Sequence, residues 1–334
     1  MKNDLTVSGV YIASVIGAGF ASGSEIVCYF AVYGKYGFLG IIIASLLFAL
    51  SATAILEISQ KTDSRNWKEV INVLFGKKCA AAVNMLTVVF MFCIFAAMLA
   101  GSGESLSEIA GCKKAVGVFL ILIITAVILV FDVRGFMAAN GVMAVFIVAG
   151  TLGVCLYLFN FREINVFKSD MKWLASGAAY TGYNVLTAGA VLPPMSEFCK
   201  SSRRVGIISG GIIFVLLCLL WGIISIYYAK IDLGVFPMLT LCRRHGVILG
   251  VIYSAVLFAA MLTTAVANAF SLTDICSGKK VYRIGFVIAL GLLLSSFKFD
   301  FFIGKIYKYA GYMGIAFMIY IVWRNRFMTE KKIN

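Results

Sequence analysis

Charged side chains are scarce in this sequence, because Asp, Glu, Lys and Arg together make up only 13% of its 334 residues. A soluble domain carries about 25% charged residues, so the chain lacks the surface that would keep it in water. It has a single histidine, His245, and three prolines. One histidine argues against a metal site, and the scarcity of charge together with the high apolar content argues against a disordered or collagen-like chain.

Cysteine is present without a recognisable pattern. The nine cysteines are odd in number, no two form a C-x-x-C motif, and most lie inside apolar runs. We interpret them as small buried hydrophobic residues rather than as metal ligands or a disulfide framework. The sequence leaves open whether Cys112 and Cys242, which both lie in predicted loops, form a disulfide.

Apolar residues dominate the chain and account for 62% of it. A hydrocarbon core about 30 Å thick requires about 20 apolar residues per helix. The apolar segments are hydrophobic on nearly all sides, which favours helices over barrel strands with alternating polarity. We therefore predict an all-α, polytopic membrane protein with ten transmembrane helices. The predicted segments are 6–33, 37–59, 79–102, 115–131, 136–160, 173–198, 204–229, 247–272, 282–297 and 301–323.

The basic side chains lie mainly in the short loops between these segments. The formal net charge is +14, but the cations form no stripe with interleaved aromatic residues, so we expect no nucleic-acid binding. We expect the cations to face the lipid bilayer and to fix the topology. The larger share of the 29 Lys and Arg residues falls on the side of the N-terminus. This bias predicts a multi-pass protein of the cell inner (cytoplasmic) membrane with both termini in the cytoplasm.

Two of the ten segments contain glycine and polar residues where a lipid-facing helix should be apolar. The first contains Gly17, Gly19 and Gly23 and carries the carboxylate of Glu25. The sixth contains Gly182 and, further along, Pro193-Pro194. Glycine and proline weaken helices. In lipid, a helix break survives only where its backbone faces protein, water or a solute. We therefore predict breaks near Gly17 and Gly182.

The spacing of the two predicted breaks indicates an internal repeat. Gly17 and Gly182 lie about half a chain apart, and each half holds five segments. Because five is an odd number of crossings, the second half must enter the membrane from the opposite side. This is the layout of an inverted-topology repeat, with residues 1–162 as the first unit and 163–334 as the second unit of one integral membrane domain.

Two short motifs extend this prediction through resemblance to a known family. The stretch 16–20, Ile-Gly-Ala-Gly-Phe, resembles the glycine-rich break in the first helix of LeuT-type transporters of the amino acid–polyamine–organocation superfamily. The stretch 260–264, Ala-Met-Leu-Thr-Thr, resembles a pattern of the sodium-dependent members. The sequence IGAGFASGSE is also similar to that of small bacterial YkvI-type membrane proteins. The resemblance implies a LeuT-like 5+5 fold with helices 1 and 6 broken.

A sodium site is one consequence of this resemblance. Residues at i, i+3 and i+4 share one helix face, and two hydroxyls with backbone carbonyls from an unwound neighbour give a hard cation an oxygen cage. The family's layout implies sodium ligands from Ala13, Ile16, Ala260, Thr263 and Thr264, and we expect no organic cofactor. The alternative is that the two threonines only hydrogen-bond back to their own helix.

The substrate site is predicted to lie between the two breaks. Backbone amides at the start of an outer half-helix suit a carboxylate. No Lys or Arg lies in the middle of the first, third, sixth or eighth segment, so an amino acid or similar zwitterion fits better than a strongly anionic solute. Ordinary helix packing is the alternative for the aromatic residues. The predicted substrate contacts are Gly17, Ala18, Gly19, Phe20, Tyr180, Tyr183 and Asn184.

Glu25 is the acidic residue that lies well inside a predicted broken helix. An intramembrane carboxylate indicates function, and three roles remain open for it: proton coupling, a gate, or a partner for a substrate ammonium group. A structural role, capping a half-helix or reaching the headgroups near Lys35, remains open as well.

A secondary active transporter of a small solute, sodium-coupled and working by alternating access, is the function that these features favour. The alternatives are a proton-coupled transporter or exchanger that uses Glu25, and a ligand-sensing subunit like those of spore germinant receptors, because fold alone does not fix function. The sequence contains no H-E-x-x-H motif and no nucleophile–histidine–acid set, so we do not expect an enzyme. We expect a monomer whose partners are a small-molecule substrate and the lipid bilayer.

Overall fold

A computed structural model describes residues 2–130, 133–158, 171–228, 232–276 and 278–330, and within these ranges the secondary structure is helical, with no strand. All ten predicted apolar segments coincide with helical segments. Apolar sequence becomes helix here because lipid offers no hydrogen bonds to the backbone, which a helix satisfies internally. The predicted boundary between the two repeats, at 162/163, lies outside the described residues.

Seven spans are formed by single helices. Four of them, and the last span, are long and apolar enough to cross a membrane by length and composition. Helix α5 is kinked at Gly76, whose φ is +70°. The seven helices are α4 (Tyr36–Thr62), α5 (Trp67–Ala110), α6 (Lys114–Val130), α7 (Val133–Leu158), α10 (Ser202–Tyr227), α12 (Val247–Ile275) and α13 (Lys280–Leu294).

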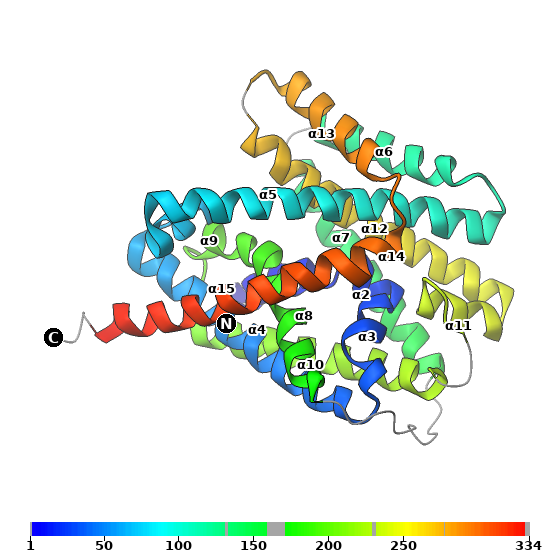
Figure 1. The fold of residues 1–334 in the computed structure, drawn as a ribbon, viewed down its shortest axis with the longest axis horizontal. Coiled ribbons are helices and arrows are strands. Elements are labelled where there is room, and N and C mark those ends of the chain that lie inside the picture. Colours follow the sequence, from blue (N-terminus) through cyan, green and yellow to red (C-terminus); the bar gives the residue numbers. More distant parts are fainter. Residues whose placement is uncertain (1, 131–132, 159–170, 229–231, 277, 331–334) are drawn as a thin grey trace.

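The helices form two packed groups that meet at the broken spans (Figure 1). In one group, α8 (Lys172–Ala188) packs between α4 and α15 (Tyr307–Glu330), and α10 packs on α4. In the other group, α12 packs against α5 and α7, and α13 and α6 cover α5 at one edge of the molecule. A short helix that the sequence did not predict, α11 (Pro237–His245), lies in the connection before α12 and packs on it.

The first span is broken where it was predicted to be. Helix α1 (Lys2–Val15) ends before Gly17, whose backbone is extended (φ −95°, ψ −169°), and α2 (Ala18–Ser22) begins directly after it. A second break lies at Gly23, whose φ of +81° is in the left-handed region that favours glycine. Helix α3 (Ser24–Tyr29) and a 3₁₀ turn (Ala31–Tyr33) complete the span. The predicted outer half-helix is therefore two short helices.

The sixth span is also interrupted, but not at Gly182, where a break was predicted. Helix α8 runs through Gly182 without interruption and changes to a 3₁₀ turn at Gly189–Val191, which leads into α9 (Leu192–Met195). A Cβ on Gly182 would overlap the carbonyl oxygen of Gly311 on α15. Gly182 is thus a site of close backbone packing between two helices, and the prediction of a break at this residue was wrong.

The last span is interrupted as well. It consists of α14 (Phe299–Phe301), a π-helical segment (Phe302–Ile306) and α15. Such π-helical turns often mark functional sites. Cys112 and Cys242, whose pairing the sequence left open, are both free thiols.

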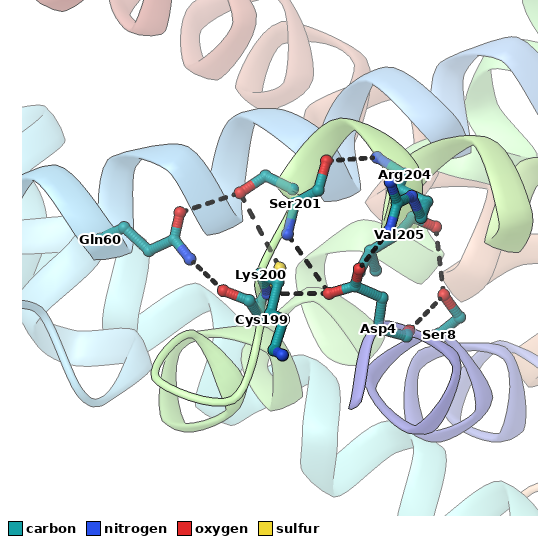
Figure 2. Close-up of polar contacts among 9 residues, drawn as sticks. Asp4, Ser8, Gln60, Cys199, Lys200, Ser201, Arg204 and Val205 are labelled. Atoms are coloured by element: carbon teal, nitrogen blue, oxygen red, sulfur yellow. Dashed lines mark hydrogen bonds and ion pairs between the residues drawn. The ribbon is translucent and has the colours of Figure 1, made fainter. Parts of the chain in front are cut away.

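A polar network joins the beginnings of the first and seventh spans on one face of the molecule, which we call the N-terminal face (Figure 2). Asp4 Oδ1 accepts hydrogen bonds from the backbone N–H groups of Lys200 (2.7 Å) and Ser201 (3.2 Å), and Oδ2 lies 3.4 Å from an Arg204 guanidinium nitrogen. Burial raises the pKa of the Asp4 carboxyl group, but these hydrogen bonds and the Arg204 charge outweigh it and hold the pKa below its ordinary value. The start of α1 is thereby tied to the segment between α9 and α10.

Gln60, near the end of α4, extends this network (Figure 2). Its Nε2 donates to the Cys199 carbonyl oxygen at 2.8 Å. The same nitrogen donates to the Ser196 carbonyl oxygen (3.0 Å), and Gln60 Oε1 accepts from the Ser202 hydroxyl (3.0 Å). Three elements, α1, α4 and the segment before α10, are therefore held together on the N-terminal face.

Candidate functional site

The break in the first span faces α12. The Gly17 amide donates to the Val15 carbonyl (3.0 Å) instead of to Ala13, so the Ala13 carbonyl loses its usual helical donor. A Cβ on Gly17 would lie 3.2 Å from Thr264 Oγ1, which places the Thr264 hydroxyl directly against the break. The structure thus places the Thr264 hydroxyl beside a break at which the Ala13 carbonyl has lost its helical donor.

Thr263, the other threonine of the predicted sodium site, behaves differently. Its hydroxyl donates to the carbonyl of Ala260 at 3.0 Å, one turn earlier in the same helix, which is the alternative that the sequence left open for both threonines. Thr263 and Thr264 are both partly exposed, whereas Ala260 is buried. Of the two hydroxyls, the one on Thr264 is the one that the structure places at the break.

The short helices α2 and α3 are held in position by hydrogen bonds from their surroundings. Tyr253 of α12 donates to the Ala21 carbonyl at 2.5 Å, and Ser24 donates to the Val235 carbonyl at 2.6 Å. The Ser22 hydroxyl donates to the Gly19 carbonyl at 2.9 Å. The bonds to Ala21 and Gly19 satisfy carbonyls of α2 that the breaks would otherwise leave without partners. The bond from Ser24 ties the start of α3 to the segment before α11.

Glu25 folds back across the bend at Gly23 and lies against Gly19. A Cβ on Gly19 would overlap the Glu25 carboxylate, and the Glu25 side chain is only 4% exposed. None of the ion pairs found among the described residues includes Glu25. The chain's own carboxylate therefore covers the surface beside Gly19, where the sequence predicted a substrate carboxylate.

Four buried tyrosines surround Glu25, and we call them the tyrosine cluster: Tyr29, Tyr180, Tyr183 and Tyr307. The ring of Tyr29 lies 5.5 Å from that of Tyr180 and 5.8 Å from that of Tyr183, and the Tyr183 and Tyr307 rings are 5.0 Å apart, measured between centroids. The hydroxyls of Tyr29 and Tyr180 have no hydrogen-bond partner, and the Tyr183 hydroxyl comes close to Glu25 without forming a hydrogen bond of good geometry. Polar atoms thus meet in a buried region without satisfying one another.

The remaining predicted substrate contacts are buried, except Gly17, which is partly exposed. Asn184 is buried and its Nδ2 donates to the Tyr180 carbonyl at 2.9 Å. Phe20 is also buried, as are Ala18 and Gly19. The structure links the two predicted groups through Glu25, which lies against Gly19 of span one and close to Tyr183 of span six. Whether any of these residues contacts a solute stays a prediction.

Sequence reasoning missed two members of the cluster. Tyr29 follows Glu25 by four residues, and residues at this spacing share a helix face, so the sequence contained a signal for it. Tyr307 had no such signal, because it lies in the last span and reaches the site only through the packing of α15 against α8.

A pocket of about 310 Å³ opens on the side of the molecule opposite the N-terminal face, between α3, the end of α10 and the π-helical turn. Tyr29 belongs both to this pocket and to the tyrosine cluster. The pocket therefore adjoins the buried region that contains Glu25. Among the lining residues are Cys28, Tyr29, Tyr33, Tyr228, Ile303 and Lys308.

Comparison with known proteins gives both sequence relatives and structural neighbours. No family model matches the chain. It is 23% identical over 320 residues to the uncharacterised membrane protein YkvI of Bacillus subtilis, covering 92% of both chains. It is 26% identical over 326 residues to the uncharacterised protein YyaD of the same organism, covering 92% of this chain and 93% of the relative. The relatives thus match along nearly their whole length.

Solved structures of transporters share the fold. MhsT, solved in complex with L-phenylalanine, superposes with a TM-score of 0.61 at 14% identity and covers 94% of this chain and 88% of its own. A sodium-coupled sialic acid symporter gives 0.62 and a manganese transporter of Eremococcus coleocola gives 0.58, each at 12% identity and covering 93% of this chain and 75% of its own. The chain is therefore a multi-pass membrane protein with the LeuT-type fold, and YkvI and YyaD are its homologues.

Proposed function

We propose that this protein is a secondary active transporter that moves a small solute across the inner membrane by alternating access, coupled to sodium. The observation that carries the proposal is the break at Gly17, held against Thr264 of α12 within a LeuT-type fold. A broken helix at membrane depth is a device for binding ions and solutes. In this proposal residues 1–162 and 163–334 form the two inverted repeats, and the protein acts as a monomer.

The sodium ion would be held by the Thr264 hydroxyl and by backbone carbonyls at the break. The Ala13 carbonyl has lost its helical donor, and the Ile16 carbonyl lies in the break itself. Neutral oxygens in this arrangement suit a hard monovalent cation. Ala260 and Thr263 belong to the proposed site in a secondary role, since the Thr263 hydroxyl is hydrogen-bonded to the Ala260 carbonyl.

The proposed substrate is an amino acid or a similar zwitterion. MhsT, a structural neighbour, was solved with L-phenylalanine bound. In this chain Glu25 lies against Gly19 and close to Tyr183, so it connects the predicted contacts of span one with those of span six. This connection through Glu25 supports a shared binding region.

The two faces of the molecule differ in a way that suits alternating access. The N-terminal face, which we propose to be cytoplasmic, is closed by the Asp4 and Gln60 network. The opposite face contains the pocket that reaches Tyr29. A hydrogen-bonded network on one face and a pocket on the other support a cycle in which the two faces open in turn.

Uptake by the purified protein in proteoliposomes tests the proposal. A mixture of radiolabelled L-amino acids should accumulate under an inward sodium gradient and not when potassium or choline replaces sodium. Thr264→Ala should weaken the sodium dependence. Ser271→Ala should not, because Ser271 lies two turns after Thr264 in the same helix and its hydroxyl is already hydrogen-bonded to the Ala267 carbonyl. Equal uptake with any of the three cations would rule out sodium coupling.

Proton coupling through Glu25 is the second candidate, favoured by the burial of this carboxylate away from any ion pair in the described part of the chain. It predicts uptake under an inward proton gradient without sodium, abolished by Glu25→Gln. Binding of an amino acid without uptake under either gradient would instead favour a ligand-sensing protein on the same fold.

A further inference from the structure

Glu25 is a buried carboxylate whose cationic partner is missing from its surroundings. Tyr183 of α8 lies close to it, and the other ionisable groups that interact with it electrostatically are Cys28, Tyr29, Tyr180 and Tyr307. All five groups are neutral or anionic, and none is a cation. A carboxylate at membrane depth is expensive unless a cation or proton accompanies it. Lys308 lines the adjoining pocket beside Cys28, but neither it nor another Lys, Arg or His of the described residues pairs with Glu25.

The tyrosine hydroxyls around Glu25 are also incompletely satisfied. Those of Tyr29 and Tyr180 are buried without a hydrogen-bond partner, and the Tyr183 hydroxyl lacks a well-formed bond. Buried polar atoms are satisfied in the great majority of native structures, and the exceptions require an explanation. Each hydroxyl oxygen can accept a hydrogen bond, as can the carboxylate. Glu25 and the cluster therefore present several acceptors and one negative charge to the same small region.

An ammonium group has the chemistry that these atoms lack. Its positive charge pairs with a carboxylate, and a primary ammonium carries three N–H donors for neighbouring acceptors. A substrate carboxylate would meet the opposite situation, because the surface beside Gly19 is already covered by the carboxylate of Glu25 and two like charges would repel.

We propose that Glu25 and the tyrosine cluster bind the ammonium group of the transported solute, so that the substrate class is small primary amines recognised by their amine end. This inference rests on the proposed transport function and specifies its substrate. An amino acid qualifies through its ammonium group, and a derivative with a neutral carboxamide in place of the carboxylate qualifies equally. A solute whose amine is acylated does not.

Tyr29 provides the route to this site. It lines the pocket on the open face and contacts Tyr180 and Tyr183 in the cluster. The cluster rings lie only 5.0–5.8 Å apart, so the solute enters by displacing one of them. Tyr29 belongs to the short helix α3, and the segment from α3 to the 3₁₀ turn is bounded by Gly23 and Gly34, whose φ values are +81° and +53°. Movement of this segment would separate the Tyr29 ring from the cluster.

Ligand-induced thermal stabilisation of the purified full-length protein tests the inference with defined probes. The twenty amino acids are each supplied in three forms: free, as the carboxamide, and as the N-acetyl acid. We expect the side chains that stabilise the protein in the free form to do so as carboxamides as well, with dissociation constants within about threefold. The corresponding N-acetyl acids should bind at least ten times more weakly. An N-methylated series should show affinity falling as N–H donors are removed.

Variants locate the effect at Glu25. Glu25→Gln should weaken the binding of free amino acids and carboxamides at least tenfold. Tyr183→Phe keeps the ring and removes one acceptor, so it should weaken binding several-fold without preventing folding. Tyr11→Phe is the matched control, because the Tyr11 hydroxyl is also buried without a partner but Tyr11 packs on Phe48, outside the cluster. It should leave the amine affinity unchanged.

Several outcomes would overturn the inference. N-acetyl acids that bind as tightly as free amino acids, carboxamides that fail to bind, or the absence of any stabilisation that depends on Glu25 would each do so. The proposed function is judged separately in proteoliposomes. Gradient-driven uptake of a solute without an amine would support transport and contradict amine recognition. Glu25-dependent amine binding without uptake would support amine recognition and contradict transport.

Discussion

The first and sixth spans are both interrupted, but the two glycines at which breaks were predicted, Gly17 and Gly182, have different structural roles. In span one, Gly17 is extended and separates α1 from α2, and its missing side chain leaves room for Thr264. In span six, Gly182 remains helical and its missing side chain leaves room for the backbone of α15. A glycine in a membrane helix can thus mark either a break or a close contact, because lipid-embedded helices use small residues for both purposes.

This difference between the two glycines determines which span supplies the irregular backbone. Span six leaves regular α-helix at Gly189, so Tyr180, Tyr183 and Asn184 are carried on a continuous helix. Span one instead offers two breaks and folds Glu25 back over Gly19. The irregular backbone of the candidate site therefore comes mainly from span one, while span six supplies the side chains that pack around it.

The largest effect on this comparison is expected from Gly182→Ala. The new methyl group would collide with the Gly311 carbonyl, which is backbone and cannot rotate away, so we expect a loss of about 3 kcal/mol in unfolding free energy. Gly211→Ala on α10 is the control, because a Cβ there meets no atom within 4 Å. Chemical denaturation in detergent measures both. If Gly182→Ala melts like the unmodified protein, α8 and α15 are not in close contact.

Asp4→Ala breaks the link between the start of span one and the segment that follows span six on the N-terminal face. Removing the buried acceptor leaves the Lys200 and Ser201 amides without partners, which should cost about 2 kcal/mol. The Arg204 side chain is 53% exposed, so its ion pair contributes little. Asp4→Asn keeps one acceptor oxygen and should lose less.

The same residue gives a pH dependence of known sign. Because the folded-state pKa of Asp4 is depressed, its contribution is fully present above the ordinary value of 3.8 and disappears as the pH falls through the lower folded value. Denaturation curves of the unmodified protein and of Asp4→Ala should therefore converge below about pH 4. Curves that stay equally far apart in acid would show that the carboxylate charge is not what stabilises this face.

Gly17→Ala tests whether the break in span one serves an ion. The backbone φ of −95° accepts alanine, but the methyl group would lie 3.2 Å from Thr264 Oγ1 and push the hydroxyl away. We expect a change of less than about 1 kcal/mol in stability and a roughly tenfold higher sodium concentration for half-maximal uptake, equivalent to about 1.4 kcal/mol. An unchanged sodium requirement would separate the break from the ion.

Gly189→Ala should have the smallest effect. Its φ is −61°, which any residue adopts, and a Cβ there would lie 3.1 Å from Ile55 Cδ1 and 3.3 Å from the Trp67 ring, both of which are side-chain atoms able to shift. We expect a loss below about 1 kcal/mol. A loss as large as that of Gly182→Ala would mean that the interruption in span six, like that in span one, depends on glycine.

Much of the architecture could be predicted from the sequence because hydropathy has a direct physical cause. Segments such as 37–59 and 204–229 became α4 and α10 with ends within a few residues of the prediction. Gly17 was identified as a break because glycine next to polar residues in lipid needs an internal partner. The second break at Gly23 was not predicted, and neither was α11, whose sequence is short and partly polar.

The candidate site was likewise predictable only in part. Glu25 could be singled out from the sequence, since a carboxylate in a membrane helix is costly and therefore functional more often than not. Tyr180 and Tyr183 were among the predicted substrate contacts and Tyr29 shares a helix face with Glu25, but the sequence did not indicate that all of them meet at Glu25. Tyr307 reaches Glu25 and Tyr183 only through the contact of α15 with α8.

The sequence by itself determined that the chain crosses a membrane ten times, where its first helix breaks, and which carboxylate lies inside it. The composition of each segment decides these properties locally, because a segment inside the bilayer must be apolar and must satisfy its own backbone hydrogen bonds. Only the tertiary structure decided that Gly182 packs rather than breaks, that Glu25 covers Gly19, and that four tyrosines close around it. Those outcomes depend on which helices pack against one another. The sequence of a single segment does not determine which distant segment it will contact.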